Sequence, residues 1–263
     1  MLRLDVLMKS HKLAVSCLAL SLPLAVVGCS SSGSKAATGS QNTATPTAAA
    51  ASSASSPSAA ASGSAGQLTG TQLAALLLQA TDLPSGFAPS TGAEVDSGGS
   101  LTTNGLVKYP FPTLSCADLV NDFGQAGFGE SAMAANVLAN STNGEIFEEA
   151  VYQFPTADDA NNFYTELKNK WPACGTISVS DSSGDSGSFT VTPESAPSGL
   201  GQQDFAFTMK GTSSGSEIAE GSTIVLDGTD VYAINPGEQG PDVPTDLDPA
   251  TLAKKLITNV STA

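Results

Sequence analysis

Apolar and polar positions alternate along much of the second half of the chain. Phe205, Phe207 and Met209 are separated by small or polar residues, which is typical of a strand with one buried face. Comparable patterns predict strands over residues 176–180, 188–192, 204–210, 222–227 and 231–235. Asp227-Gly228, between the last two, is a strong hairpin-turn signal. The second half is therefore predicted to be rich in β-structure.

The first half contains further elements of both kinds. Two strands are predicted over 133–138 and 146–154, on either side of the hairpin signal Asn143-Gly144. A first helix is predicted over 71–80, before the turn at 82–86, and a short second helix over 116–123, with Ser115 as its N-cap. A last helix begins at Asp248-Pro249 and runs to about residue 260.

The clearest helix covers residues 156–171. Thr156 can cap it, and two aspartates follow in the first turn, where the helix dipole favours negative charge. Five apolar or aromatic residues recur at helical spacing on one face: Ala160, Phe163, Tyr164, Leu167 and Trp171. Pro172 is expected to end the helix.

Helices at the start, middle and end, with hairpin-linked strands between them, predict an α+β fold. We expect a single antiparallel β-sheet with helices packed on one side. The folded domain is predicted to occupy residues 67–263.

The N-terminal 28 residues have the layout of a secretory signal peptide. A short basic segment precedes an apolar run over 13–27, which is too short for a membrane span. The junction Val26-Val27-Gly28-Cys29 resembles a bacterial lipobox, which implies cleavage before Cys29 and its modification with palmitate-type acyl chains. The alternative is an uncleaved signal anchor with an ordinary cysteine.

Residues 29–66, which follow this junction, are almost entirely Ser, Ala, Thr and Gly. A segment of this composition has almost nothing to bury, so it is predicted to be a disordered tether. A flexible coil of this length spans roughly 35 Å on average.

Removal of residues 1–28 changes the charge and the available chemistry. Seven lysines then face 24 acidic residues, a formal net charge of −17, so nucleic acid is not expected as a partner. Membrane contact is expected through the N-terminal lipid anchor. The only histidine and the only arginine, His11 and Arg3, leave with the leader. Without histidine, Ser-His-Asp catalytic triads and histidine-ligated zinc sites are excluded. We therefore expect no enzyme activity, metal or cofactor.

The cysteines can be assigned one by one. Cys17 leaves with the leader and Cys29 is the lipidation site, which leaves Cys116 and Cys174. In an oxidising exported location these two are expected to form one disulfide. A pair of free thiols is the alternative.

Three polar motifs have simpler structural interpretations. Residues 211–215 match G-x-S-x-G but join two predicted strands, so we interpret them as a hairpin loop. Residues 181–186 suggest a calcium loop but lack its sixth-position glycine and twelfth-position carboxylate. A looser acidic cluster is either a weak calcium site or a solvated acidic surface: Asp227, Asp230, Glu238, Asp242, Asp246 and Asp248.

Three aromatic residues are weak candidates for ligand contact. Tyr109 and Phe111 lie in a proline-stiffened segment, where they could form the rim of a cleft. Trp171 lies on the apolar helix face, where a core position is favoured over a ligand platform.

The segment AVYQFPTADDANNFYTELKNKWPACGTISV, residues 150–179, ends with a W-x-x-C pattern. Together with LLLQATDLPSGF (76–87) and Cys116, it resembles the PknH-like extracellular sensor domain family. That domain occurs on mycobacterial receptor kinases and in actinobacterial lipoproteins. The resemblance implies a helix-backed sheet with a cleft for an unidentified extracellular ligand. One departure is that the kinase ectodomain has two disulfides, whereas this chain can form only one.

The functional hypothesis is a lipoprotein held on the extracytoplasmic face of the cell membrane. Its sensor-like domain would bind an unidentified small molecule or envelope partner. The alternative is a carrier of an apolar or lipid molecule, with the Phe-rich sheet face lining a cavity. A hydrolase with a Ser/Lys pair is a third hypothesis, for which the sequence holds no supporting motif.

Overall fold

The fold was analysed in a computed structural model of the chain. It describes residues 67–90, 92–96, 115–121, 128–180, 186–213 and 215–263. The signal peptide, Cys29, the tether, Tyr109, Phe111 and the 181–185 segment lie outside the described residues.

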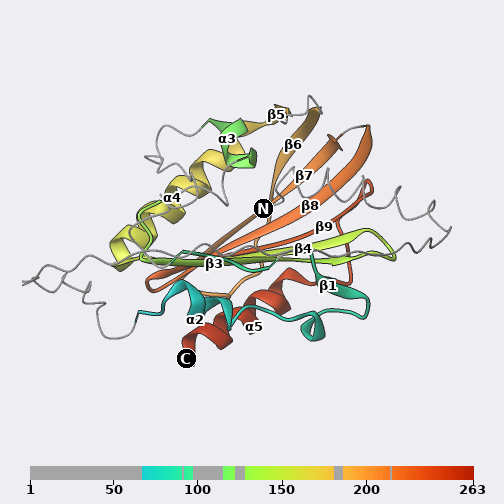
Figure 1. The fold of residues 1–263 in the computed structure, drawn as a ribbon. Coiled ribbons are helices and arrows are strands. Elements are labelled where there is room, and N and C mark those ends of the chain that lie inside the picture. Colours follow the sequence, from blue (N-terminus) through green and yellow to red (C-terminus); the bar gives the residue numbers. More distant parts are fainter. Residues whose placement is uncertain (1–66, 91, 97–114, 122–127, 181–185, 214) are drawn as a thin grey trace, which may run out of the picture.

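The described residues form a single antiparallel sheet of nine strands (Figure 1). Its order is β1-β3-β4-β9-β8-β7-β6-β5, and β2 also pairs with β3. The strands are β1 (Phe87–Pro89), β2 (Glu94–Asp96), β3 (Ala132–Asn140), β4 (Glu145–Gln153), β5 (Thr176–Ser180), β6 (Ser186–Glu194), β7 (Gln203–Ser213), β8 (Ser216–Asp227) and β9 (Asp230–Glu238). The predicted α+β class, with one antiparallel sheet, is confirmed.

The predicted hairpins form where the turn residues allow them. Gly144 has φ of 79° between β3 and β4, and Gly228 has φ of 63° between β8 and β9. Residues other than glycine rarely adopt a positive φ of this size, because their Cβ atom is then crowded. This explains why both turns carry a glycine. The G-x-S-x-G segment also belongs to a hairpin, because Ser213 of β7 pairs with Ser216 of β8.

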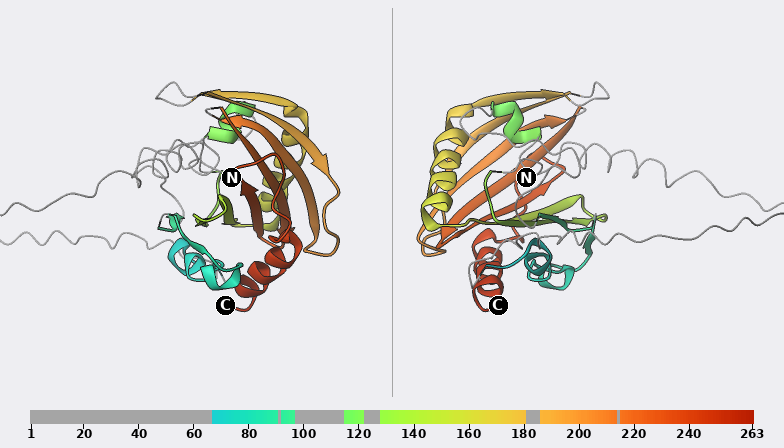
Figure 2. Two further views of the ribbon diagram at one scale, coloured as in Figure 1. Left: turned by 90° about the vertical axis from the view of Figure 1, so that its right-hand side faces the viewer. Right: turned by 60° about the vertical axis from the view of Figure 1, so that its left-hand side comes forward.

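The sheet is strongly bent, and its two faces bury different clusters (Figure 2). On β4, Ile146, Ala150 and Tyr152 face the inside of the bend, which we call the concave face. Phe147 and Val151 face the opposite, convex side. The division follows from the two-residue side-chain period of a strand.

Helices cover both faces (Figures 1 and 2). Helices α3 (Cys116–Asn121) and α4 (Ala157–Cys174) lie on the concave face, whereas α2 (Gly70–Ala74), the short 3-10 helix η1 (Ala80–Asp82) and α5 (Pro249–Ser261) lie on the convex face. The expectation that helices pack on one side was therefore wrong. The central strands are apolar on both faces, so each face needs its own cover.

Two helix boundaries differ from the prediction. Helix α2 ends at Ala74 rather than residue 80, and the chain that follows places both Leu77 and Leu78 in the convex core. Because the helix ends early, the backbone carbonyls that follow it accept hydrogen bonds from side chains. For example, Asn136 Nδ2 donates to the Leu78 carbonyl oxygen at 3.1 Å. Tertiary partners thus replace helical ones.

Helix α4 does not end at Pro172, as the sequence predicts, but continues to Cys174. The predicted cap is present, since Thr156 Oγ1 accepts a hydrogen bond from the Asp159 backbone N–H at 3.1 Å. A proline removes one helical hydrogen bond. The fully buried Trp171 and the disulfide at Cys174 hold the last turn in place despite that loss.

In the part of the chain that the structure describes, we found no helix with the length and apolar character needed to cross a bilayer.

Candidate functional site: the concave face of the sheet

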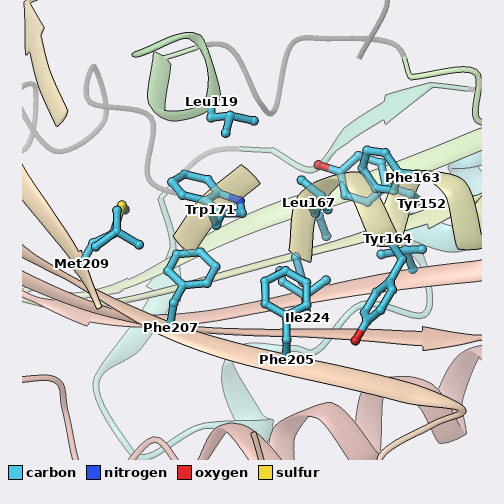
Figure 3. Packing of buried hydrophobic residues seen from close by; sticks show 14 of the residues in the cluster. Leu119, Tyr152, Phe163, Tyr164, Leu167, Trp171, Phe205, Phe207, Met209 and Ile224 are labelled. Carbon is cyan, nitrogen blue, oxygen red and sulfur yellow. The ribbon is translucent and has the colours of Figure 1, made fainter. Parts of the chain in front are cut away.

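Helix α4 fills one end of the concave face with aromatic side chains (Figure 3). Trp171 stacks on Phe207 with ring centroids 4.8 Å apart, and Tyr164 meets Phe205 edge-on at 5.4 Å. Such pairs stabilise the packing beyond their buried area. The structure places Trp171 in the core, 0% exposed, so it offers no open surface to a ligand.

The disulfide between Cys116 and Cys174 joins α3 to the end of α4, with the two Cα atoms 5.6 Å apart. The predicted pairing is therefore present. Because the bond connects residues 58 positions apart, it holds α3 beside the aromatic core, where Leu119 is fully buried. The bond fixes the position of α3 relative to the end of α4.

Four buried polar residues lie on three neighbouring strands of this face: Glu148 of β4, Asn235 of β9, and Ser222 and Glu220 of β8. We call them the polar row. Glu148 pairs directly with Asn235 across the two strands, and all four residues are at most 7% exposed. On β7, Phe207 lies opposite Ser222 and Met209 lies opposite Glu220, so the row borders the aromatic core.

The polar row is rich in hydrogen-bond acceptors. Ser222 Oγ donates a hydrogen bond to Glu220 Oε1 at 3.4 Å, and none of the four residues lacks an interaction partner. Two carboxylates and an amide on neighbouring strands suit groups that donate hydrogen bonds or carry positive charge.

The pKa of the neighbouring Tyr152 reflects the acidic character of this face. Burial raises the pKa of Tyr152 well above its usual value, and the negative charges of Glu130, Glu148 and Glu94 raise it further. Glu130 is itself buried, and its Oε2 accepts the Phe128 backbone N–H at 2.5 Å. The concave face therefore combines an apolar floor with several carboxyl groups.

Sequence reasoning missed the polar row. The signal was present as Glu148-Glu149, two adjacent charges within a strand that is otherwise largely apolar. Adjacent residues of a strand point to opposite faces, so one glutamate had to enter each side of the sheet. Only the strand order places Asn235 of β9 opposite Glu148 and puts Ser222 on the strand after it, β8.

The acidic residues toward the C-terminus do not form one site. Asp230 accepts a hydrogen bond from Gln153 Nε2 at 3.0 Å, Asp242 pairs with Lys210 at 3.1 Å, and Asp248 caps α5. Among the described residues there is no group of three or more histidine, cysteine or acidic side chains that could hold a metal ion.

The serine of the G-x-S-x-G motif, Ser213, lies in a buried position. Ser213 is 0% exposed at the end of β7, and its hydroxyl has no hydrogen-bond partner among the described residues. A nucleophile needs an adjacent base and access to its substrate. The segment thus has the structure of the predicted hairpin.

These features define an α+β domain closed by one disulfide. Residues 68–217 match the family model described as PknH-like extracellular domain, more than half of the chain, and the chain belongs to this family. The predicted resemblance is confirmed, and the family indicates an extracytoplasmic location.

Among solved structures, the crystal structure of the extracellular domain of PknH from Mycobacterium tuberculosis is similar to this chain. The TM-score is 0.52 at 19% sequence identity, covering 75% of this chain and 100% of that domain. At this identity the similarity supports the fold alone. No curated protein matches the chain.

Proposed function

We propose that this chain is a lipoprotein, acylated at Cys29, whose domain binds an envelope ligand or partner through the concave face. Family membership supports an extracytoplasmic domain, and the lipobox-like Val26–Cys29 segment supports the anchor. The domain would carry recognition, and the lipid would confine it to the outer face of the cell membrane.

The polar row is the observation on which the binding proposal depends. Binding sites typically combine an apolar surface with a few convergent polar groups. Glu148, Glu220 and their neighbours supply such groups on the apolar concave face. A ligand with hydrogen-bond donors or a positive charge suits this set.

The test compares the molecules that co-purify with the wild-type protein and with its variants, each isolated intact from its own membrane. We expect the double variant Glu148→Gln, Glu220→Gln to lose the bound species seen by native mass spectrometry. Glu217→Gln is the matched control, because Glu217 is an exposed residue of the same strand, β8. Unchanged Trp171 fluorescence would show that the core remains folded.

Two outcomes would contradict this assignment. Equal retention by the double variant and the control would exclude the polar row as the site. Retained lipid beyond the N-terminal acyl chains would favour the carrier alternative. Packing of the Phe-rich face argues against a carrier, because α4 side chains already fill the space above Phe205 and Phe207.

A further inference from the structure

A buried glutamate lies on the convex face, beneath the chain that runs from α2 toward β1. We call residues 75–83 of this chain the strap. Glu149 of β4 is 0% exposed, and neither of its carboxyl oxygens has a well-formed hydrogen bond to a described residue. Asn136, directly opposite on β3, has a buried side-chain oxygen, Oδ1, that also lacks a partner there. Three buried acceptor oxygens therefore share one small area of the convex face.

The strap covers this area. Asn136 Nδ2 donates to the Leu78 carbonyl oxygen at 3.1 Å, and the Leu78 backbone lies close enough to Glu149 to lower the pKa of its carboxyl group in part. Leu77 and Leu78 are at most 2% exposed and belong to the convex core. The strap is therefore part of the cover that keeps water from the Glu149 carboxyl group.

The charged groups around Glu149 favour its neutral form. Burial raises the pKa of Glu149 to about 8, and the negative charge of Asp82 in the strap adds to this effect. Lys255 of α5 pairs with Asp82 at 2.6 Å, and Tyr232, on the same face of β9, donates its hydroxyl to Asp230 at 3.5 Å. The side chains of α2, β1 and β3 carry no charge. No described cation therefore pairs with Glu149.

The strap is the element that can give way when Glu149 becomes charged. A buried carboxylate without a cation is costly unless water reaches it. Strand β4 is paired on both sides, with β3 and β9, so it is held in place. The strap, in contrast, is fastened through side chains: the Asn136 bond, the Asp82–Lys255 ion pair, and a bond of 3.0 Å from Asn259 Nδ2 to the Leu76 carbonyl. Segments with few backbone hydrogen bonds open at the lowest free energy.

We propose that Glu149 is a proton-dependent latch for the strap. With its proton in place the carboxyl group is neutral, supplies one O–H donor opposite the unpartnered Asn136 oxygen, and stays buried. Loss of the proton leaves a buried negative charge within reach of the charge of Asp82, which lies on the strap itself, so the two carboxylates repel each other. The strap then opens and exposes Leu77 and Leu78. The convex face thus has a closed state at low pH and an open population that grows as the pH rises.

Hydrogen exchange of the intact, detergent-extracted protein tests the latch. The closed strap holds a proton that the open strap releases. The opening constant of the strap amides, corrected for the base catalysis of exchange, should therefore rise by up to about tenfold per pH unit between about pH 5 and 8. Amides of the central strand β9 should open at a larger free energy at each pH. Equal opening free energies for the strap and β9 would mean that only global unfolding occurs, which would overturn the proposal.

Two glutamine variants of β4 isolate the carboxyl group. Glu149→Gln keeps a hydrogen-bond donor and carries no charge at any pH, so opening of its strap should no longer depend on pH. Glu145→Gln is the matched control, because Glu145 is a buried residue on the same face of β4 but lies at the start of the strand, opposite Glu238. This control should keep the wild-type pH dependence. A dependence that persists in Glu149→Gln, or one that disappears in Glu145→Gln, would contradict the latch.

Infrared spectroscopy observes the proton directly. A protonated carboxyl group has a carbonyl stretch distinct from the bands of a carboxylate. The difference spectrum between wild type and Glu149→Gln should show this stretch at about pH 6 and lose it as the pH rises through about 8. Absence of the stretch at about pH 6 would show that Glu149 is charged beneath a closed strap, and the proposal would then be wrong.

Discussion

Glu149 shows how one residue can make the domain sensitive to pH. Its carboxyl group lies on the convex face, 0% exposed, between Asn136 of β3 and the chain that follows α2. Burial raises the pKa of Glu149 to about 8. The Leu78 backbone and the Asn136 amide lower the pKa in part, but neither carboxyl oxygen has a well-formed hydrogen bond.

The raised pKa predicts that stability falls as the pH rises from about 4.5 to about 8. The folded protein holds the proton more tightly than the unfolded chain, whose pKa is 4.5. The stabilising effect of the proton is complete below about pH 4.5. It is lost progressively between about pH 4.5 and about 8, at up to ~1.4 kcal/mol per pH unit, and the free energy of unfolding then levels off. Glu149→Gln should therefore raise the melting temperature at pH 8 and flatten its pH dependence.

Glu166→Gln is the control for this prediction, since Glu166 is an exposed residue of α4. It should leave the pH dependence as it is in the wild type. Urea melts of the three proteins between pH 5 and 9 give the free energies. Parallel curves for wild type and Glu149→Gln would show that this carboxyl group does not titrate as inferred.

At the scale of elements, α4 and its disulfide organise the concave face. Phe163 contacts Phe128, Tyr152 and Phe154, with ring centroids 4.9 to 6.2 Å apart across this cluster. The helix thereby packs on β4 at one end, and its last turn is bonded to α3 at the other. The position of α4 depends on both contacts.

Reduction of the disulfide should lower the melting temperature. Loop closure over 58 residues corresponds to about 4 kcal/mol, which is a shift of roughly 10 °C for a domain of this size. Circular dichroism melts with and without reducing agent measure the shift. The double variant Cys116→Ser, Cys174→Ser is the control and should not respond to the reductant. An unchanged wild-type melt would mean that the bond does not constrain the unfolded chain.

At the scale of the whole molecule, the first described residues lie at the end of β4. Gln67 Nε2 donates to the Phe154 carbonyl at 2.8 Å, and the Leu68 N–H donates to Gln153 Oε1 at 2.7 Å. Gln153 also donates to Asp230 at the end of β9. The first described residues are therefore tied to the sheet, so that any force on the N-terminal segment reaches the central strands.

The proposed anchor predicts where the protein is found after cell fractionation. Cys29→Ala should release it from the membrane, because the acyl chains would be its attachment. Its domain should remain folded, as judged by the fluorescence of buried Trp171. Cys17→Ala, a change within the predicted leader, should leave the protein in the membrane fraction. Membrane retention of Cys29→Ala would rule out lipidation as the attachment.

The sequence by itself determined the local elements. Alternation predicted the strands, glycine-containing turns predicted the hairpins, and helical spacing predicted the buried face of α4 from Ala160 to Trp171. These predictions succeeded because each depends on neighbours a few residues apart. The disulfide followed from counting, since only Cys116 and Cys174 were left to pair.

Only the tertiary structure decided what lies on each face of the sheet. Strand order brings Glu148, Asn235 and Glu220 together from three strands and leaves β5 at an edge. Long-range packing also overrode local signals, since α2 ends early and α4 continues past Pro172. Strand pattern fixes which residues share a face, but strand order depends on contacts between distant segments, and no local pattern contains them.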